Sequence, residues 1–256
     1  MRLKCISLPI EPELNQCLAQ LLQAAAANES RRVLAEAFMY RHHPQTLKAK
    51  ELVESGRLGK LRTLRGSFTF TLTREEDYRW EAAMGGGSLW DVGCYPVNYA
   101  RYLVGAEPLE VFGWQVLGEG GCDEILVGQM RFPGEILAQF DCGFRSPLRT
   151  ELEVVGSQGT LTIPQPFKPG KKGELLLKQN DRIETISTPG QELYRGEVED
   201  MTDAILLGST VRVNLEDSRA NTGAIQALLA SAHTRLPVSI KPGNTMIPWG
   251  KTSQDY

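Results

Sequence analysis

The sequence predicts an α+β protein built on a large open antiparallel sheet, with helices on one face and a short βαβ segment in front of it. Three observations lead to this prediction. Strand-like runs with a two-residue period follow one another after Pro108, the links between them are short, and only a few stretches show helical spacing. Short links favour antiparallel hairpins, so most of the sheet should be antiparallel.

The N-terminal segment is expected to form strand, helix and strand. Leu3–Leu8 and Val33–Met39 are apolar strand-like runs, and leucines between positions 14 and 25 repeat at helical spacing. A helical crossover makes two such strands parallel. A lone βαβ unit cannot cover both faces of a sheet, so it must be joined by further strands or pack against the later part of the chain.

The next part of the chain alternates between helix and strand. We expect a helix over Gln45–Ser55, a strand over Leu61–Leu72 and a charged loop over Thr73–Met84. Gly85–Gly87 then leads into a helix over Ser88–Val104 that contains a proline, which removes one backbone donor. The three glycines allow another backbone or a ligand to approach closely.

The second half of the chain supplies most of the sheet. Strands are predicted at Leu109–Leu117, Cys122–Phe132, Glu135–Phe144, Thr150–Val155, Thr160–Ile163, Glu174–Gln179 and Arg182–Ile186. Two helices come after them, Glu192–Leu207 and Asp217–His233. So few helices leave one sheet face without cover. Because a partner subunit is the usual cover, we expect a homodimer through the open sheet.

Composition limits the classes of function. The net charge of −3 over 256 residues argues against nucleic acid as a partner. No apolar run approaches the ~18 residues that span a bilayer, so no membrane association is expected. The five cysteines form no C-x-x-C pair, which argues against a metal site and a disulfide framework and favours the cytoplasm. Cys122 and Cys142 lie in apolar runs and should pack in the core.

Three motifs in order resemble those of a known enzyme family. They are E-A-F-M-Y-R-H-H-P at Glu36–Pro44, G-G-G-S-L-W-D-V-G-C-Y at Gly85–Tyr95, and E-D-S at Glu216–Ser218 with a later Pro237-Val238. Together they resemble the Gfo/Idh/MocA oxidoreductases over about Ser7–Ile240. The tyrosine that ends the second motif resembles the branch of glucose-fructose oxidoreductase, xylose dehydrogenase and dihydrodiol dehydrogenase.

The resemblance implies a domain division and a cofactor. Residues 1–40 would be a remnant of the dinucleotide-binding Rossmann domain, residues 41–240 the substrate-binding and dimerisation domain, and residues 241–256 a tail. The implied reaction passes a hydride between the nicotinamide of NAD or NADP and a carbon of a sugar or cyclic diol. Substrate identity, the choice of NAD or NADP and the reaction direction stay open.

The same resemblance implies the site residues. Tyr95 would be the proton donor, because a phenol with a pKa of about 10 is protonated at neutral pH. Asp91 would orient Tyr95 or bind substrate, and its i, i+4 spacing from Tyr95 places both on one helix face, next to Arg41. Phe38, Tyr40 and Arg41 would border the nicotinamide. The alternative is that Asp91 is simply an acid favoured in a first helical turn and that Tyr95 packs.

Two departures from the family weaken the enzyme interpretation. Where the family has E-K-P with a lysine that eases proton transfer, this chain reads Ser7-Leu8-Pro9, and Leu8 can neither donate a proton nor polarise an oxygen. G-x-G-x-x-G occurs nowhere in the sequence, and Gly118–Gly121 lies between antiparallel strands with no helix to hold a pyrophosphate. We therefore expect no tight NAD(P) binding and no turnover by this chain alone.

Two other interpretations stay open. The chain could be a catalytically silent domain that dimerises or binds a sugar-like ligand, or a truncated copy of a longer active gene.

Overall fold

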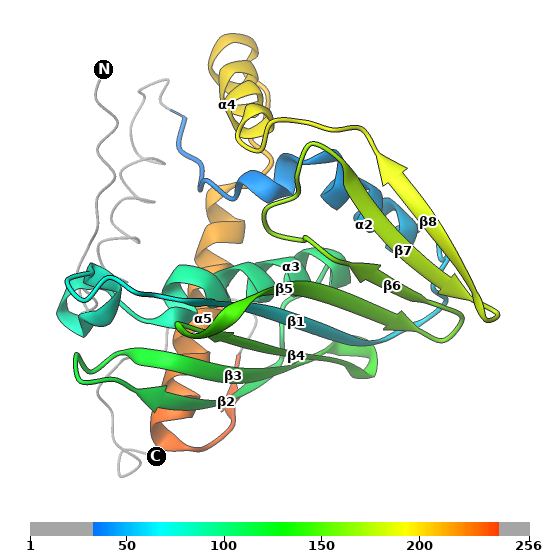
Figure 1. Cartoon of the computed structure of the whole chain (residues 1–256). Helices are drawn as coiled ribbons and strands as arrows, with labels where there is room; N and C mark the ends of the chain where they lie inside the picture. Colours follow the sequence, from blue (N-terminus) through cyan, green and yellow to red (C-terminus); the bar gives the residue numbers. More distant parts are fainter. Residues whose placement is uncertain (1–32, 241–256) are drawn as a thin grey trace.

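The computed structural model describes residues 33–240 and contains one nine-stranded sheet (Figure 1). Its strands are β1 Leu61–Thr71, β2 Glu110–Leu117, β3 Asp123–Phe132, β4 Ile136–Gly143, β5 Arg145–Gly156, β6 Thr160–Ile163, β7 Gly173–Gln179, β8 Arg182–Thr188 and β9 Val238–Ser239. In space the order is β8-β7-β6-β5-β1-β4-β3-β2-β9. The α+β class with a large open sheet is confirmed.

One pair of neighbouring strands departs from the expected antiparallel arrangement. β1 pairs with β4 in parallel and with β5 antiparallel, and the remaining pairs in the sheet are antiparallel. β4 and β5 follow one another in the chain and run in opposite directions. β1 lies between them, so it must run parallel to one and antiparallel to the other. The turn residues that predict a hairpin between β4 and β5 do not show that a strand from elsewhere in the chain lies between them.

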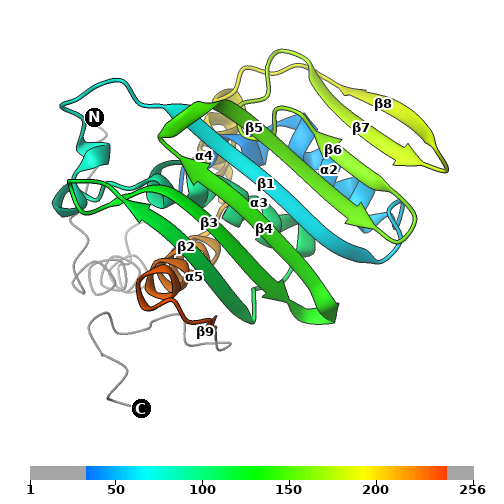
Figure 2. The same ribbon diagram turned by 60° about the horizontal axis from the view of Figure 1, so that its bottom comes forward.

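Helices cover one face of the sheet and leave the other open. α2 Pro44–Glu54, α3 Cys94–Val104 and α5 Leu215–Thr234 lie behind the strands in Figure 2, and the face of β1 to β5 turned to the viewer carries no helix. α4 Arg195–Leu207 projects from one end of the molecule (Figure 1). The core lies between the covered face and the helices, where Leu64, Phe140 and Leu103 are almost fully buried.

The strand expected at Val33–Met39 is not formed. Residues 33–38 have no regular structure, and Met39–His42 is a short 3-10 helix. A strand needs a hydrogen-bonded neighbour, and this segment pairs with none of the nine strands. Its apolar side chains are buried without forming a strand, because Phe38, together with Tyr40 just after the segment, packs against α3 and the sheet.

The rest of the expected βαβ segment, with Leu8, and the tail at 241–256 lie outside the described residues. The domain boundaries at 40 and 240 stay a prediction.

The helix expected from Ser88 begins as a π-helical turn. Leu89–Gly93 has π geometry, and the regular α-helix α3 starts at Cys94. Pro96 is thus in the first turn after the π turn, where a missing backbone donor is tolerated better than inside an α-helix. Single-turn π segments are frequent at functional sites, and this one carries Asp91.

Other expectations concern cysteines and surface charge. Cys122 and Cys142 are buried and free, which confirms their place in the core.

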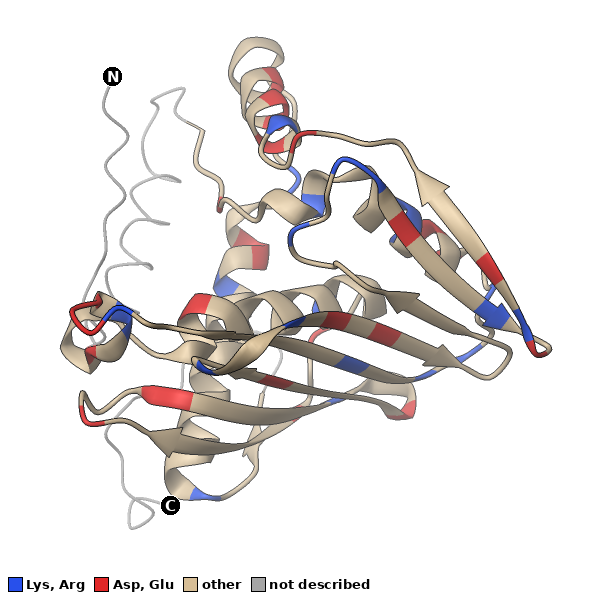
Figure 3. Cartoon of the chain, in the orientation of Figure 1, with Lys and Arg blue, Asp and Glu red and all other residues tan. Residues whose placement is uncertain are grey.

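Within residues 33–240, no group of three or more His, Cys, Asp and Glu side chains lies close enough together to hold a metal ion. No helix in this range is long and apolar enough to cross a membrane. Figure 3 shows lysine and arginine interspersed with aspartate and glutamate over the described elements.

Candidate functional site

Tyr95 lies at the start of α3 against an aromatic wall. Its ring centroid is 5.4 Å from that of Phe68, 5.6 Å from that of Phe38 and 5.8 Å from that of Tyr40. Among residues 33–240 the hydroxyl donates only to the Met39 sulfur, at 3.9 Å, which is a weak acceptor. Burial, together with the nearby Cys94 and Asp91, raises the pKa of the Tyr95 phenol above its usual value. The group is therefore a proton donor and not a base at neutral pH.

Asp91 is held by an arginine that the sequence analysis did not select. The Nε atom of Arg79 lies 2.8 Å from Oδ2 of Asp91, and the same guanidinium contacts Asp77 at 3.2 Å. It also lies over the ring of Tyr78, 4.7 Å from the centroid. Arg79 belongs to the charged loop before the glycines, and only the fold brings it to Asp91.

Tyr40 and Arg41 are tied to α3 through one amide oxygen. Oδ1 of Asn98 accepts from the Tyr40 hydroxyl at 2.6 Å and from NH1 of Arg41 at 2.9 Å. Arg41 is buried, its guanidinium lies 3.9 Å from the ring centroid of Tyr102, and NH1 also donates to Asp217 at 2.8 Å. Of the three residues expected at the nicotinamide, Phe38 and Tyr40 contact Tyr95 directly, whereas Arg41 is linked to them through Asn98.

The Arg41 contacts continue into a buried ionic network. The second carboxylate oxygen of Asp217 accepts from NH1 of Arg101 at 3.0 Å, and Arg101 makes two hydrogen bonds of 2.6 Å with Glu107. Asp217 also lies in the first turn of α5, where its backbone N–H donates to Oδ1 of the N-cap residue Asn214. The E-D-S motif therefore joins α5 to α3 and to the 3-10 helix.

The triple glycine before the π turn is packed against the protein itself. Gly87 has φ +116°, and a Cβ on it would lie 2.4 Å from Oδ1 of Asp123. A Cβ on Gly86 would lie 2.6 to 2.8 Å from three backbone carbonyl oxygens, those of Arg79, Tyr78 and Glu81. These close approaches explain why glycine is needed at both positions.

The start of the π turn is already occupied by a carboxylate. Asp123 of β3 accepts from the Ser88 hydroxyl at 2.6 Å and from the Leu89 N–H at 2.7 Å. Burial raises the pKa of Asp123 to about 6. A pyrophosphate would need free N–H donors here, and it would meet a carboxylate and carbonyl oxygens. This glycine loop therefore does not fit the phosphates of NAD(P), and no other glycine-rich turn in the described residues leads into a helix.

The first turn of α4 faces the 3-10 helix that carries Tyr40 and Arg41. A Cβ on Gly196 would lie 2.7 Å from the Cβ of His42, and Nε2 of His42 lies 3.3 Å from Oδ2 of Asp200. Beside Gly196, one carboxylate oxygen of the half-buried Glu197 is buried, with no hydrogen-bond partner in the part of the chain that the structure describes. Burial raises the pKa of Glu197, and its charge acts on Tyr95. Sequence analysis missed Glu197 because a glutamate early in a helix is ordinarily a surface residue.

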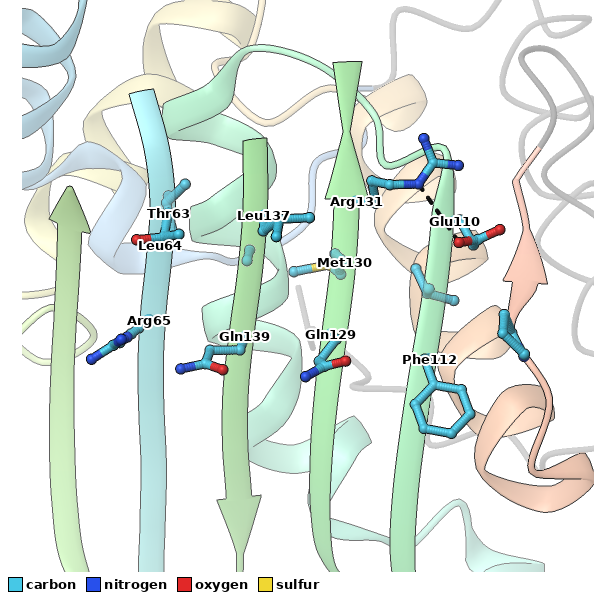
Figure 4. Close-up of a pocket in the computed structure, with 13 residues that line it drawn as sticks. Thr63, Leu64, Arg65, Glu110, Phe112, Gln129, Met130, Arg131, Leu137 and Gln139 are labelled. Carbon is cyan, nitrogen blue, oxygen red and sulfur yellow. Dashed lines mark ion pairs between the residues drawn. The ribbon is translucent and has the colours of Figure 1, made fainter. Parts of the chain in front are cut away.

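A separate groove lies on the open face of the sheet, away from Tyr95. It has a volume of about 550 Å³ and runs over β1, β4, β3 and β2, with Arg65, Gln139, Gln129 and Phe112 pointing out of the sheet (Figure 4). Arg131 and Glu110 form an ion pair of 3.6 Å at one end. Trp114, Val127 and Leu137 are exposed apolar side chains on these strands, each about half exposed.

Comparisons with known proteins match the chain to one oxidoreductase family. A model of the Gfo/Idh/MocA C-terminal domain matches residues 46–162. A D-xylose 1-dehydrogenase (NADP(+)) of Haloferax volcanii is 33% identical over 211 residues, which are 81% of this chain and 64% of the relative. A dTDP-3,4-didehydro-2,6-dideoxy-alpha-D-glucose 3-reductase of Actinomadura kijaniata is 28% identical over 81% of this chain and 64% of the relative. The chain thus spans less than two thirds of these relatives.

Solved structures share the fold. An aldose-aldose oxidoreductase from Caulobacter crescentus, complexed with glycerol, superposes with a TM-score of 0.80 at 23% identity, over 88% of this chain and 69% of that one. A 3-ketoreductase from Actinomadura kijaniata, complexed with NADP and TDP-benzene, gives a TM-score of 0.79 at 24% identity, over 85% of this chain and 67% of that one. At these identities the likeness is one of fold.

Proposed function

Because the chain belongs to the Gfo/Idh/MocA family, we propose that it is the sugar- or polyol-binding part of an NAD(P)-dependent oxidoreductase. One observation supports this above the others. The Tyr95 hydroxyl is a proton donor whose one partner in the described part of the chain is a sulfur, and it lies among aromatic rings near the Asp91–Arg79 ion pair. A ligand carbonyl or hydroxyl oxygen would give this donor the strong acceptor that it lacks.

Each site residue has a role in this proposal. Tyr95 donates a proton to the ligand oxygen as a carbonyl becomes a carbinol, and takes it back in the reverse direction. Asp91, fixed by Arg79, orients the ligand beside the phenol. Phe38 and Tyr40 border the nicotinamide, and Arg41 holds Tyr40 in place through Asn98. NAD or NADP, when bound, supplies or accepts the hydride.

Turnover by this chain alone is not part of the proposal. The glycine loop is filled by Asp123 and by carbonyl oxygens, G-x-G-x-x-G is absent from the sequence, and Leu8 stands where the family has lysine. Much of the binding energy of a dinucleotide comes from parts remote from the reacting carbon, and that energy also orients the reaction. Calorimetry should show no NAD+ or NADP+ binding in the micromolar range. Micromolar binding, or steady cofactor reduction with an aldose, would contradict this.

A silent sugar-binding domain is the second candidate, supported by the same lack of a phosphate site. Both candidates require a sugar or polyol to bind at Tyr95. The test is an NMR titration of the 256-residue chain with D-xylose and with a cyclic diol. Tyr95→Phe should abolish binding, whereas Tyr102→Phe, which removes a phenol hydroxyl about two turns along α3, should leave it unchanged. Failure of the unaltered chain to bind either ligand would remove the site.

We also propose that two copies of the chain associate through the open sheet face. Trp114 of β2 and Val127 of β3 form an exposed apolar pair on this face, and Leu137 of β4 is exposed as well. The polar row of Arg65, Gln139 and Gln129 lies between that pair and Leu137, so the proposed interface is mixed in character. Val127→Glu should convert a dimer to a monomer in light scattering. Ile183→Glu, at an exposed position of the β7–β8 hairpin, is the control. A monomeric unaltered chain at micromolar concentration would exclude this dimer.

The free thiols of Cys94, Cys122 and Cys142 are consistent with a reducing compartment such as the cytoplasm.

A further inference from the structure

Two polar groups near the 3-10 helix Met39–His42 lack strong partners among residues 33–240. One is the Tyr95 hydroxyl, a donor whose acceptor in the described range is the Met39 sulfur at 3.9 Å. The other is a carboxylate oxygen of Glu197, which is buried and accepts no hydrogen bond within the described residues. Buried polar atoms in proteins are nearly always hydrogen-bonded, so the buried oxygen of Glu197 needs an explanation.

The fold holds Glu197 in this position. α4 begins close to the 3-10 helix because Gly196 has no side chain to strike His42, and the His42–Asp200 contact fastens the next turn of α4 to the same helix. Glu197 lies between these two contacts, and it interacts electrostatically with Tyr95. The packing of α4 therefore covers one carboxylate oxygen of Glu197, while the side chain as a whole is half-buried.

No cation among the described residues offsets this carboxylate. The neighbouring basic groups have other partners, because Arg195 pairs with Glu199 at 2.7 Å and His42 contacts Asp200. Burial is the cause of the raised pKa of Glu197, with no attractive charge opposing it. A buried carboxylate without a counter-ion favours ligands that donate hydrogen bonds and repels anions.

We propose that Glu197 is a ligand-binding residue that accepts hydrogen bonds from the hydroxyl groups of a neutral sugar or polyol while Tyr95 donates to another oxygen of the same ligand. This inference rests on the proposed sugar site, and it states which class of ligand that site prefers. A polyol both accepts and donates hydrogen bonds, so one molecule can serve the phenol and the carboxylate together. Sugar acids should bind poorly, because their carboxylate would face that of Glu197.

The experiment compares variants of the full chain in NMR titrations with D-xylose. Glu197→Ala should weaken binding at least about tenfold, the effect of losing a hydrogen bond to a charged group. Glu197→Gln keeps an acceptor oxygen and should recover part of the loss. Glu199→Gln, on the same helix but exposed and paired with Arg195, is the control and should bind like the unaltered chain. D-glucuronate should bind more weakly than D-xylose to the unaltered chain only.

A second measurement does not depend on substitution. The side-chain carboxyl carbon of Glu197, assigned by its disappearance in Glu197→Gln, should shift when D-xylose is added. Unchanged D-xylose affinity in both Glu197 variants, with binding lost in Tyr95→Phe, would overturn the role of Glu197 and leave the proposed function standing. A chain that binds no neutral sugar would overturn both. Tighter binding of D-glucosamine than of D-glucose, lost in Glu197→Gln, would overturn the hydroxyl assignment in favour of a cation site.

Discussion

The polar side chains of Tyr95, Asn98 and Arg101 follow one another along α3, and the two ends of this α3 stripe differ in how their polar groups are hydrogen-bonded. At the later end, Asn98 and Arg101 are buried and bonded to Arg41 and Asp217 by contacts of 2.9 and 3.0 Å. At the early end, the Tyr95 hydroxyl reaches only a sulfur at 3.9 Å. The later end thus holds the fold together through Oδ1 of Asn98 and the Arg101 guanidinium, although Nδ2 of Asn98 has no partner among the described residues. The early end gives the Tyr95 hydroxyl only a weak acceptor within the same range.

This difference separates residues that stabilise the structure from residues that await a ligand. A buried charge with matched partners loses heavily when one partner is removed, because the rest of the network stays buried. A group without a strong partner can be removed at little cost to stability. The stabilities of matched variants therefore distinguish residues that hold the fold together from residues that could bind a ligand.

The largest effect is expected for Asp217→Ala. Asp217 bridges Arg41 and Arg101, whose side chains are 6% and 3% exposed, so its loss leaves two buried guanidinium groups short of a carboxylate. Breaking a buried pair in this way costs about 3 kcal/mol or more. Urea unfolding should show this loss, whereas Glu199→Ala, which breaks an exposed pair, should change the free energy of unfolding by about 0.5 kcal/mol or less. Equal losses in both variants would contradict the structural role of the network.

The next effect depends on pH and concerns Asp123. Burial raises its pKa from 3.8 to about 6, so the folded protein binds this proton more tightly than the unfolded chain. The resulting contribution to stability is fully present below about pH 4 and is lost as the pH rises through about 6. A shift of this size corresponds to about 3 kcal/mol. The difference in unfolding free energy between the unaltered chain and Asp123→Asn should change by this order between about pH 4 and pH 7. A constant difference would show that Asp123 is not buried as a carboxylate.

Sequence alone predicted the elements that depend on local signals. The two-residue period located β2 to β8, and helical spacing located α2, α3, α4 and α5 to within a few residues. The strand at Val33–Met39 was wrong because an apolar run can bury its side chains without joining a sheet, as Phe38 and Tyr40 do here. The parallel β1–β4 pair was missed because it depends on strands distant in the chain.

Some residues of the candidate site could be predicted from sequence and others could not. Tyr95 and Asp91 could be selected because a motif carries them, and that choice stays a prediction. Arg79 and Glu197 could not be selected, because one lies in a loop and the other in a helical turn whose places relative to Tyr95 are set by tertiary packing. Spacing along one element reports a shared face, but it does not report which residues of other elements face it.

The smallest effect on stability is expected for Tyr95→Phe, and Tyr40→Phe provides the matched comparison. The two rings lie 5.8 Å apart in one cluster, yet the Tyr40 hydroxyl donates to Asn98 at 2.6 Å and the Tyr95 hydroxyl has only the Met39 sulfur. Tyr40→Phe loses a buried hydrogen bond, worth about 1 kcal/mol, although Asn98 keeps its bond from Arg41. Tyr95→Phe keeps the ring packing and should change the unfolding free energy by about 0.5 kcal/mol or less.

Urea unfolding of both variants, run beside the D-xylose titration, measures stability and binding on the same proteins. We expect Tyr40→Phe to lower stability and Tyr95→Phe to remove binding with stability nearly unchanged. If Tyr95→Phe were the more destabilising of the two, the hydroxyl of Tyr95 would have a structural partner of its own, and the early end of the α3 stripe would no longer differ from the later one.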